Sequence, residues 1–548
     1  MNDPGANVAR HLKEAAIRFP EATATLTPSG RGLEGRALHE ARTFRELDRE
    51  SDAVATLIES EGIRPGDRVL LAVRPGRELI TGMFALLKAG AVPVAIDPGM
   101  GPRSFLSCVK SSAPSGLLGT RTATLLSRLP LAALDSIRIR LTCGGRRWRK
   151  AAEDSGTTHR PITPRRPDDE AAVLFTSGST GAPKGVRYDH GMFNAQIGLI
   201  RGTFGIAHGE VDMAMLPLFA LFNPALGVTT VTPALDPSRP MNADPEPLVS
   251  ALLSEKVTTS FGSPAIWGKV ADHCEARGAT LPSLRRLLIA GAPVSAELIA
   301  KLRVIAPNCV THTPYGATEC LPVTTIRGDE LLGEARQLAL RGEGTCVGTA
   351  VEGVEVRIIR ETDGPIGSLG EAAECGSGEA GEIIATGPNV TREYDALPEA
   401  TRLAKIREGD RIWHRMGDLG RIGTDGRLYF LGRRAEKVRT AEGELPTECL
   451  EPAFRQHPHV ARCALIGLGE PPRQIPALVV EARPGAHPET REARERFEAE
   501  LRGIARVNPR SEMVRHIVFQ RALPVDVRHN AKIHRLRLAE EWTARLAP

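Results

Sequence analysis

The sequence predicts an α/β protein: a large layered N-terminal body that includes a β-rich subdomain, followed by a small, mobile C-terminal α+β domain. Three observations support this fold class. The chain has 548 residues, 41% of them hydrophobic, so it is too long for one ordinary domain and can bury large cores. Apolar runs of strand length alternate with amphipathic helical segments in its first part. The pattern changes after Gly348 and again after Gly432, which predicts domains over residues 1–432 and 433–548.

The N-terminal body begins with two segments of helical spacing and then alternates strands with helices. A strand, a helix and a second strand in succession imply a parallel pair of strands joined by a right-handed crossover. Further runs typical of buried strands recur later, which makes this part of the chain a layered α/β body. The expected helices are Val8–Phe19, Phe44–Glu61 and Glu78–Ala89, and the expected strands are Arg68–Val73, Ala91–Ile96, Val257–Phe261, Arg286–Ala290 and Val310–Tyr315.

The last two parts of the chain differ from the first in their pattern of apolar and turn-forming residues. After Gly348, short alternating segments separated by Gly, Pro and Asp turns indicate a β-rich subdomain, with a mobile loop between its first two strands. From Arg433 onward, helices and strands indicate a smaller α+β unit. The expected β-rich segments are Val354–Ile359 and Gly381–Ala385, the loop is Gly364–Gly381, and the C-terminal elements are helices Glu448–His457 and Glu489–Ala505 and strands Val460–Ile466 and Ala477–Glu481.

Composition excludes several function classes. The formal net charge is only +5, which does not indicate a nucleic-acid partner. The nine cysteines are scattered without a Cys-x-x-Cys pair, so they are expected to be reduced thiols in a cytoplasmic protein. We expect no signal peptide, because the start of the sequence lacks a basic region followed by an apolar core, and no apolar run reaches the roughly 18–20 residues that a membrane span needs. We therefore expect a soluble, cytoplasmic protein with no transmembrane segment.

The stretch from Leu174 to Val186 predicts a phosphate-binding loop. It follows an apolar strand-like run and contains three glycines, four hydroxyl side chains and Lys184. Such a turn presents N–H and O–H donors into one concavity, and the lysine adds charge, which suits a polyphosphate. A flexible linker is the weaker reading, and Pro183 and Gly185 rule out the P-loop spacing. The candidate nucleotide-binding residues are Thr176, Ser177, Gly178, Ser179, Thr180, Gly181 and Lys184.

This stretch resembles the signature of the adenylate-forming superfamily, which holds acyl-CoA synthetases, peptide-synthetase adenylation domains and luciferases. Further stretches match that superfamily in order, from about the first strand–helix–strand unit to the C-terminal tail. The resemblance implies the adenylate-forming enzyme fold, with ATP and Mg²⁺ as cofactors. It also implies that residues 1–432 bind ATP and the acyl substrate, and that residues 433–548 carry a catalytic lysine.

Two of these stretches imply contacts to the base, the α-phosphate and the metal. Gly291, Ala292 and Pro293 follow a buried strand and form a small-residue turn against which a flat base can slide. The second stretch spans residues 315–319. The resemblance implies that its aromatic residue stacks on adenine, its threonine contacts the α-phosphate and its glutamate holds Mg²⁺, which often takes only one or two carboxylates from the protein. The candidates there are Tyr315, Gly316, Thr318 and Glu319, with Glu319 as the metal ligand.

The later stretches imply the ribose contact, the hinge and the catalytic lysine. Asp418 in Arg415–Gly420 matches the family's ribose-binding carboxylate, and Arg433 matches the residue before its hinge. The hinge position itself is Ala435, where the family commonly has Asp or Lys. Lys532 matches the lysine that bridges the substrate carboxylate and the α-phosphate, a positional and electrostatic role.

The acyl acceptor is the point at which the chain departs from the acyl-CoA synthetases. Ala220 stands where many members have His, and the loop Arg439–Glu448 is shorter than the family's pantetheine-lining loop. With the stretches around residues 317–322 and 525–533, these departures are similar to the olefin β-lactone synthetase branch. That resemblance implies that a long-chain 2-alkyl-3-hydroxy fatty acid is adenylated and that its own hydroxyl closes a β-lactone. The expected acyl-contacting residues are Phe219, Leu221, Phe222, Asn223 and Gly262. Phe219, Leu221, Phe222 and Leu226 are equally good core residues.

Two alternative functions stay open from the sequence. The first is a long-chain acyl-CoA or acyl-carrier-protein synthetase, and the second is a non-catalytic acyl- or nucleotide-binding protein. His190 and His529 are candidate bases for ring closure, although a lone histidine is more often structural. The resemblance also implies a ketone reductase and a β-lactone decarboxylase as pathway partners.

Overall fold

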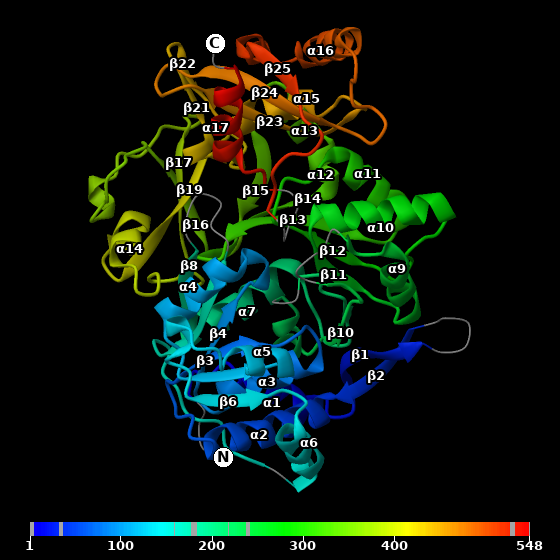
Figure 1. The fold of residues 1–548 in the computed structure, drawn as a ribbon, viewed down its shortest axis with the longest axis vertical. Helices are drawn as coiled ribbons and strands as arrows, with labels where there is room; N and C mark the ends of the chain where they lie inside the picture. Colours follow the sequence, from blue (N-terminus) through cyan, green and yellow to red (C-terminus); the bar gives the residue numbers. More distant parts are fainter. Residues whose placement is uncertain are drawn as a thin grey trace.

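The fold was analysed in a computed structural model that describes residues 5–31, 37–157, 159–176, 183–216, 219–236, 242–526 and 532–546. The predicted α/β class is confirmed, with two large sheets covered by helices and smaller sheets near the C-terminus. Figure 1 shows the blue and cyan N-terminal elements at one end of the molecule and the orange and red C-terminal elements at the other, above the green and yellow strands.

The first large sheet carries the predicted strand–helix–strand unit. Within the described ranges it has six strands, in the order β6-β5-β3-β4-β7-β8. Arg68 lies opposite Val92 in a parallel pair, as the pattern predicts, whereas the last strand runs antiparallel to its neighbour. The strands are β3 (Arg68–Ala72), β4 (Val92–Ile96), β5 (Gly116–Gly119), β6 (Ile139–Thr142), β7 (Glu170–Thr176) and β8 (Lys184–Asp189).

The second sheet joins a parallel half to the β-rich segment. Over the described residues it has fourteen strands, thirteen in the order β16-β17-β19-β20-β15-β14-β13-β12-β11-β9-β10-β1-β2 and β18 paired with β19. They are β1 (Thr23–Arg31), β2 (Ala37–Thr43), β9 (Val211–Asp212), β10 (Thr229–Val231), β11 (Thr259–Gly262), β12 (Arg286–Ile289), β13 (Val310–Ala317), β14 (Cys320–Arg327), β15 (Thr345–Ala350), β16 (Glu355–Ile359), β17 (Gly381–Thr386), β18 (Lys405–Glu408), β19 (Arg411–Ile422) and β20 (Leu428–Arg433).

Helices cover these sheets, and the predicted ones begin and end within two residues of their expected bounds. The second helix starts at a capping box, in which the Thr43 hydroxyl accepts from the Glu46 N–H and the Glu46 carboxylate accepts from the Thr43 N–H. The helices are α1 (Arg10–Arg18), α2 (Phe44–Ser60), α3 (Arg77–Lys88), α4 (Pro102–Ser112), α5 (Arg121–Leu126), α6 (Arg146–Glu153), α7 (His190–Phe204), α8 (Asn223–Leu226), α9 (Pro245–Ser254), α10 (Pro264–Arg277), α11 (Ala296–Ile305), α12 (Gly328–Leu332), α13 (Glu334–Leu340) and α14 (Pro398–Ala404).

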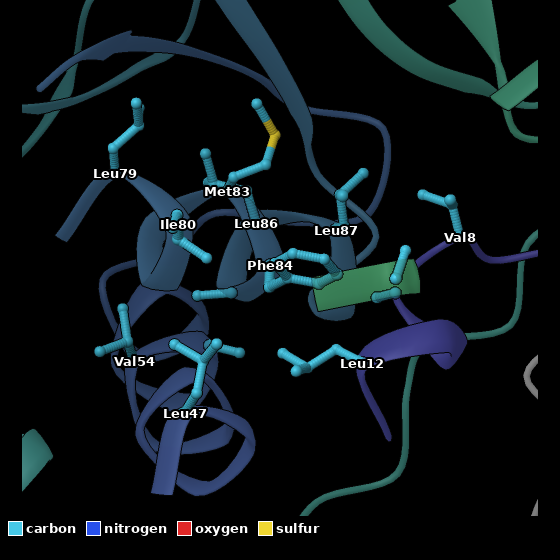
Figure 2. Close-up of a cluster of buried hydrophobic side chains, with 14 of the residues drawn as sticks. Val8, Leu12, Leu47, Val54, Leu79, Ile80, Met83, Phe84, Leu86 and Leu87 are labelled. Carbon is cyan, nitrogen blue, oxygen red and sulfur yellow. The ribbon is translucent and has the colours of Figure 1, made fainter. Parts of the chain in front are cut away.

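Helix α3 lies at the centre of the largest hydrophobic cluster. Figure 2 shows Ile80 and Phe84 on the side of α3 that faces Leu47 of α2 and Leu12 of α1, whereas Met83 lies on its other side. Because α3 buries residues all round, it reads in the sequence as a nearly continuous apolar helix. Helix α3 therefore packs with α1 and α2 in one hydrophobic core.

Beyond Arg433 the strands form separate small sheets. A hairpin pairs β21 (Val438–Thr440) with β22 (Gly443–Leu445), and β23 (Val460–Leu468), β24 (Ile475–Ala482) and β25 (His516–Phe519) form a second sheet. Its helices are α15 (Glu451–Phe454), α16 (Arg491–Ala505) and α17 (Arg535–Leu546).

One predicted C-terminal helix is much shorter than expected. Instead of a helix over Glu448–His457, a 3-10 turn ends at Cys449 and α15 covers four residues. The break lies at Leu450, whose φ of -129° is outside the helical range, and Pro452 then occupies the first turn of α15. All nine cysteines are free thiols, and none of the helices in the described ranges is long and apolar enough to cross a bilayer.

Candidate active site

A cavity of about 2130 Å³ opens between the ends of the two large sheets and the C-terminal unit. Its walls include residues from most of the stretches singled out in the sequence. Those that line it are Lys184, Phe219, Leu221, Phe222, Gly291, Ala292, Pro293, Tyr315, Gly316, Thr318, Glu319, Asp418, Arg433 and Lys532. Residues up to 348 positions apart in the chain, from Lys184 to Lys532, therefore face one space.

The predicted phosphate loop connects β7 to β8. Thr176 and Lys184 are opposite each other in the antiparallel pair, so the loop between them starts and ends at one point on the sheet edge. The Lys184 ammonium lies 4.8 Å from the centre of the Tyr394 ring, a cation–π contact that directs it along the cavity wall. Ser177, Gly178, Ser179, Thr180 and Gly181 lie outside the described residues.

The small-residue turn Gly291–Pro293 follows β12 at the same edge. Gly291 has a φ of +94°, which only glycine adopts readily, so the turn after β12 depends on glycine at this position. Gly316 on β13 also needs to be glycine, since a Cβ there would lie 2.7 Å from the Cys320 carbonyl oxygen. Both glycines allow backbone to come close to the cavity.

Tyr315, Asp418 and Arg433 form a connected group on adjacent parts of the large sheet. The Tyr315 hydroxyl donates to Asp418 Oδ2 at 2.6 Å, and Arg433 Nη1 lies 2.8 Å from Asp418 Oδ1. Asp418 and Arg433 are register partners on β19 and β20. Burial raises the pKa of Asp418, against the opposing effects of the Arg433 charge and the Tyr315 hydrogen bond. The arrangement places a carboxylate beside an aromatic ring at the cavity wall.

Glu319 lies in the tight turn between β13 and β14, next to Thr318. Its Oε1 accepts from the Tyr394 hydroxyl at 2.7 Å, and its carbonyl oxygen accepts from the Thr391 N–H at 2.9 Å. The Thr318 carbonyl oxygen accepts from the Tyr188 hydroxyl at 2.5 Å. The turn is therefore held from both sides, which fixes the direction of the Glu319 carboxylate.

The charge state of Glu319 depends on residues that the sequence did not single out. Burial alone would raise its pKa, but the surrounding groups outweigh burial and hold the pKa below its usual value. Burial lowers the pKa of His414 to about 3, so His414 is neutral near pH 7 and contributes no charge there. The hydrogen bond from Tyr394 and the nearby Lys405 ammonium therefore keep Glu319 ionised.

Lys405 is a buried cation at this site. Its Nζ donates to Thr391 Oγ1 at 3.0 Å, and burial lowers its pKa to about 8, against the pull of Glu319. Among the described residues no group of three or more His, Cys, Asp or Glu side chains is arranged to hold a metal ion. A divalent ion here would rely on Glu319 and on oxygens brought by a ligand.

Lys532 reaches the cavity from the C-terminal unit. Its N–H donates to Asp526 Oδ1 at 3.0 Å, and its carbonyl oxygen accepts from the Asp526 N–H at 2.9 Å, which fixes the backbone that carries it. Both Lys532 and Asp418 line the cavity, and the charge of Lys532 lowers the pKa of Asp418 against the effect of burial. In this structure the N-terminal and C-terminal candidates thus face the same space.

The acyl-contacting candidates divide into two groups. Phe219, Leu221 and Phe222 line the cavity, and the Phe219 ring stacks on Phe261 with centroids 3.7 Å apart. Asn223 does not line it, because its amide turns away and donates to the buried Asp212 carboxylate at 2.7 Å. Gly262 lies behind the wall, where a Cβ would come within 2.7 Å of the Trp267 indole nitrogen. These two residues shape the wall from behind instead of lining it.

Of the two candidate bases, His190 is described by the structure and does not line the cavity. His190 is buried under the first helix, where its Nδ1 accepts from the Val8 N–H at 3.2 Å, and burial lowers its pKa to about 4. It holds the N-terminal segment in place, which is the structural role that a lone histidine more often has. His529 lies outside the described residues.

Comparison with known proteins agrees with these motifs. The model of the family described as AMP-binding enzyme matches residues 12–395. An olefin beta-lactone synthetase of Xanthomonas campestris pv. campestris is 42% identical over 551 residues, covering 98% of this chain and 97% of its own. One of Stenotrophomonas maltophilia is 42% identical over 562 residues, covering 100% and 99%.

A solved structure extends the likeness to the fold. The anthranilate CoA ligase AuaEII in complex with anthranoyl-AMP superimposes with a TM-score of 0.80 at 20% identity, covering 100% of this chain and 99% of its own. The resemblance read from the sequence motifs is thus confirmed at the level of family and fold. The chain belongs to the AMP-binding enzyme family.

Proposed function

We propose that the chain is an ATP-dependent β-lactone synthetase that acts on a long-chain 2-alkyl-3-hydroxy fatty acid. The observation that carries this proposal is the 42% identity, over nearly the whole chain, to two enzymes named olefin beta-lactone synthetases. The cavity supports it, because the nucleotide-type residues and a long apolar wall line one space. The products are a β-lactone, AMP and pyrophosphate.

ATP binds, in this proposal, with its adenine against Tyr315 and the turn Gly291–Pro293. The ribose hydroxyls donate to Asp418, whose carboxylate is already oriented by Tyr315 and Arg433. The phosphates lie toward Lys184 and the loop Thr176–Gly181, with Thr318 at the α-phosphate. Asp418, Lys184 and Thr318 would each make a hydrogen bond or ion pair of the polarity that their part of ATP requires, whereas Tyr315 would stack on the base.

Glu319 is suited to hold Mg²⁺ on the phosphates. It is a single ionised carboxylate at the cavity wall, and Mg²⁺ in nucleotide sites takes one or two carboxylates with phosphate oxygens and waters. When bound, the ion supplies positive charge that offsets the charge of the triphosphate. Tyr394 and Lys405 serve this role indirectly, by keeping Glu319 ionised.

The first step is adenylation. A substrate carboxylate oxygen attacks the α-phosphorus of ATP, a new P–O bond forms, and the bond to the β-phosphate breaks to release pyrophosphate. Lys532 places its ammonium between the carboxylate and the α-phosphate, where negative charge is concentrated in the transition state. The acid is thereby joined to AMP, a good leaving group.

The second step is ring closure by the substrate's own β-hydroxyl. Its oxygen attacks the acyl carbon, the acyl–phosphate C–O bond breaks, AMP leaves, and the hydroxyl proton passes to a base or to water. Because both groups belong to one bound molecule, the step is intramolecular, which can offset several kcal/mol of entropy and help against ring strain. No external acceptor is required.

We further propose a division of labour between residues 1–432 and 433–548. Strand β20 ends the large sheet at Arg433, and the strands after it form separate sheets, which supports a boundary at this point. A pivot near Ala435 would move Lys532 relative to the bound nucleotide. We also propose a cytoplasmic location, with the reductase and β-lactone decarboxylase of olefin formation as partners.

A product analysis tests the function. The purified chain is incubated with ATP, Mg²⁺ and a synthetic 2-alkyl-3-hydroxy fatty acid without CoA, followed by NMR of the organic extract and measurement of AMP. We expect one β-lactone for each AMP. If acyl-AMP accumulates and is consumed only when CoA or a carrier protein is added, the chain is an acyl-CoA or acyl-carrier-protein synthetase. A chain that only binds acyl groups or nucleotides would release no pyrophosphate.

A further inference from the structure

The cavity has an apolar branch that leaves the nucleotide side and ends against the N-terminal segment. Its walls come from α7, which carries Phe193 and Ile197, and from Phe222 at the start of α8. Its far end is formed by Met83 and Leu87 of α3 and by Val8, all of which line the cavity although each is at most 5% exposed. The branch is therefore closed at this end, and its wall is apolar apart from the buried Gln196 amide, whose nitrogen donates to the Leu321 carbonyl oxygen.

The end wall is built on one face of α3. Met83 and Leu87 are four residues apart, so they lie on one face of the helix, opposite the face that packs on α2. Figure 2 shows Met83 and Leu87 on this face and Val8 beside Leu87. Leu12, four residues after Val8, does not itself line the cavity and points toward Phe84, which does.

Hydrogen bonds hold Val8 in place. The Val8 N–H donates to His190 Nδ1 at 3.2 Å, and the Asn7 amide donates to the Leu87 carbonyl oxygen at 2.8 Å. On the other side of the segment, the Asn194 amide donates to the Ala6 carbonyl oxygen at 2.7 Å. Asn7 and His190 are both almost fully buried, so these bonds are shielded from water. The end of the branch is thus a fixed wall.

A second part of the cavity is open. It runs along Pro264, Ala265 and Gly268 of α10 toward the ion pair of Asp272 with Lys301, whose nitrogen and oxygen are 2.6 Å apart. The Asp272 side chain is 68% exposed, so this part reaches the surface. A chain lying there can extend past the protein, whereas a chain in the closed branch cannot.

We propose that the closed branch receives one of the two alkyl arms of the substrate, and that Val8, with Met83 behind it, sets the longest arm accepted there. This inference rests on the proposed function, because it assigns a place to one arm of the 2-alkyl-3-hydroxy acid. The other arm lies in the open part of the cavity, where no wall limits its length sharply. One arm therefore has a sharp upper length limit and the other has a broad one.

The test measures lactone formation with two series of acids, in which each arm in turn is lengthened two carbons at a time. In the wild-type chain kcat/KM should fall steeply beyond one length for one series only. Val8→Ala, which removes two methyl carbons, should move that limit to longer arms. Val8→Phe should move the limit to shorter arms. In this variant, kcat/KM for the longest arm that the wild type accepts, divided by kcat/KM for the next shorter arm, should fall at least about tenfold. The other series should be unchanged in both variants.

Leu12→Ala is the matched control, since it also truncates a buried residue of the same segment but one that does not line the cavity. It should lower the melting temperature without moving either limit. Unchanged limits in both Val8 variants, or an equal shift in Leu12→Ala, would overturn the assignment while the wild-type chain still makes lactone. If the wild-type chain makes no lactone with any acid, the proposed function fails and the assignment fails with it.

Discussion

Lys88 offers the sharpest test of how the N-terminal body is held together. It is the last residue of α3 and is fully buried, with its Nζ 2.5 Å from Asp48 Oδ1 and 2.6 Å from Asp52 Oδ1. Lys13 of α1 completes the group, 3.1 Å from Asp48 and 3.0 Å from Asp52. Two lysines and two aspartates thus join α1, α2 and α3 beneath the cavity.

Replacing Lys88 with Met keeps the side-chain length but leaves two buried carboxylates with Lys13 alone. Breaking a buried ion pair in this way costs about 3–5 kcal/mol, because the remaining charge stays desolvated. With an unfolding entropy of about 2 cal/mol/K per residue, a unit of about 430 residues should melt about 4–6 °C lower. Lys13→Met should cost less, because the Lys13 side chain is 23% exposed and water can replace part of the interaction.

The measurement is calorimetric melting of Lys88→Met in two backgrounds, the wild type and the double variant Asp48→Asn, Asp52→Asn. In the second background no buried carboxylate is left unpaired, so the same substitution should cost much less. The reasoning is refuted if Lys88→Met costs the same in both backgrounds, since its effect would then come from packing and not from charge.

Three further predictions concern charges in and near the site. Burial raises the pKa of Asp212 to about 7, so the folded chain binds a proton that the unfolded chain loses near pH 4, and stability falls as the pH rises from about 4 to about 7. Asp212→Asn should remove this dependence, so the substitution should raise the free energy of unfolding by on the order of 4 kcal/mol more at pH 8 than at pH 4; a pH-independent effect would contradict it. Tyr394→Phe removes the hydrogen bond to Glu319, which should raise the pKa of Glu319 and move the acidic limb of the pH–rate profile upward by about one to two pH units; an unmoved limb would show that Glu319 does not titrate there. Lys532→Ala should slow pyrophosphate release about 10²–10³-fold while ATP still binds, measured by pyrophosphate assay and nucleotide titration; equal loss of binding would point to a structural role.

Most of the fold was predictable from the sequence because its signals are local. Arg68–Ala72, Arg77–Lys88 and Val92–Ile96 each carry their own apolar pattern, and the parallel pairing follows from their order. The failure at Glu448–His457 has the opposite cause. Its apolar spacing is helical, but the chain breaks at Leu450. On one side of the break Glu448 accepts from the Thr345 hydroxyl at 2.7 Å, and on the other side Glu451 pairs with Arg535 at 2.8 Å. A tertiary interaction overrides the local pattern there.

The site was predictable only where a contiguous motif marked it. Tyr315 and Glu319 lie in one short stretch, and both line the cavity, whereas their roles at the adenine and the metal stay predictions. Tyr394 and Lys405 act on Glu319 from 75 or more residues away, within a segment that has no distinguishing pattern, so the sequence gives no signal for them. Asn223 shows the opposite case. It follows Phe222, which lines the cavity, but its own amide points away from the cavity to Asp212.

The contacts around Arg433 show that the proposed nucleotide-binding residues and Lys532 belong to different units of the fold. Arg433 belongs to the large sheet, where it pairs with Asp418, so the proposed ribose contact does not depend on the C-terminal unit. Directly after it, Arg434 and Lys437 bind Glu361 of the N-terminal body at 3.2 and 2.7 Å. A pivot near this point would break those ion pairs and carry Lys532 away while Tyr315, Asp418 and Arg433 stay together. Enzymes that use an added acceptor must make room for it after adenylation, whereas a β-hydroxyl nucleophile arrives with the acid. For lactone formation, therefore, the orientation that brings Lys532 to the cavity has no need to change before the ring closes.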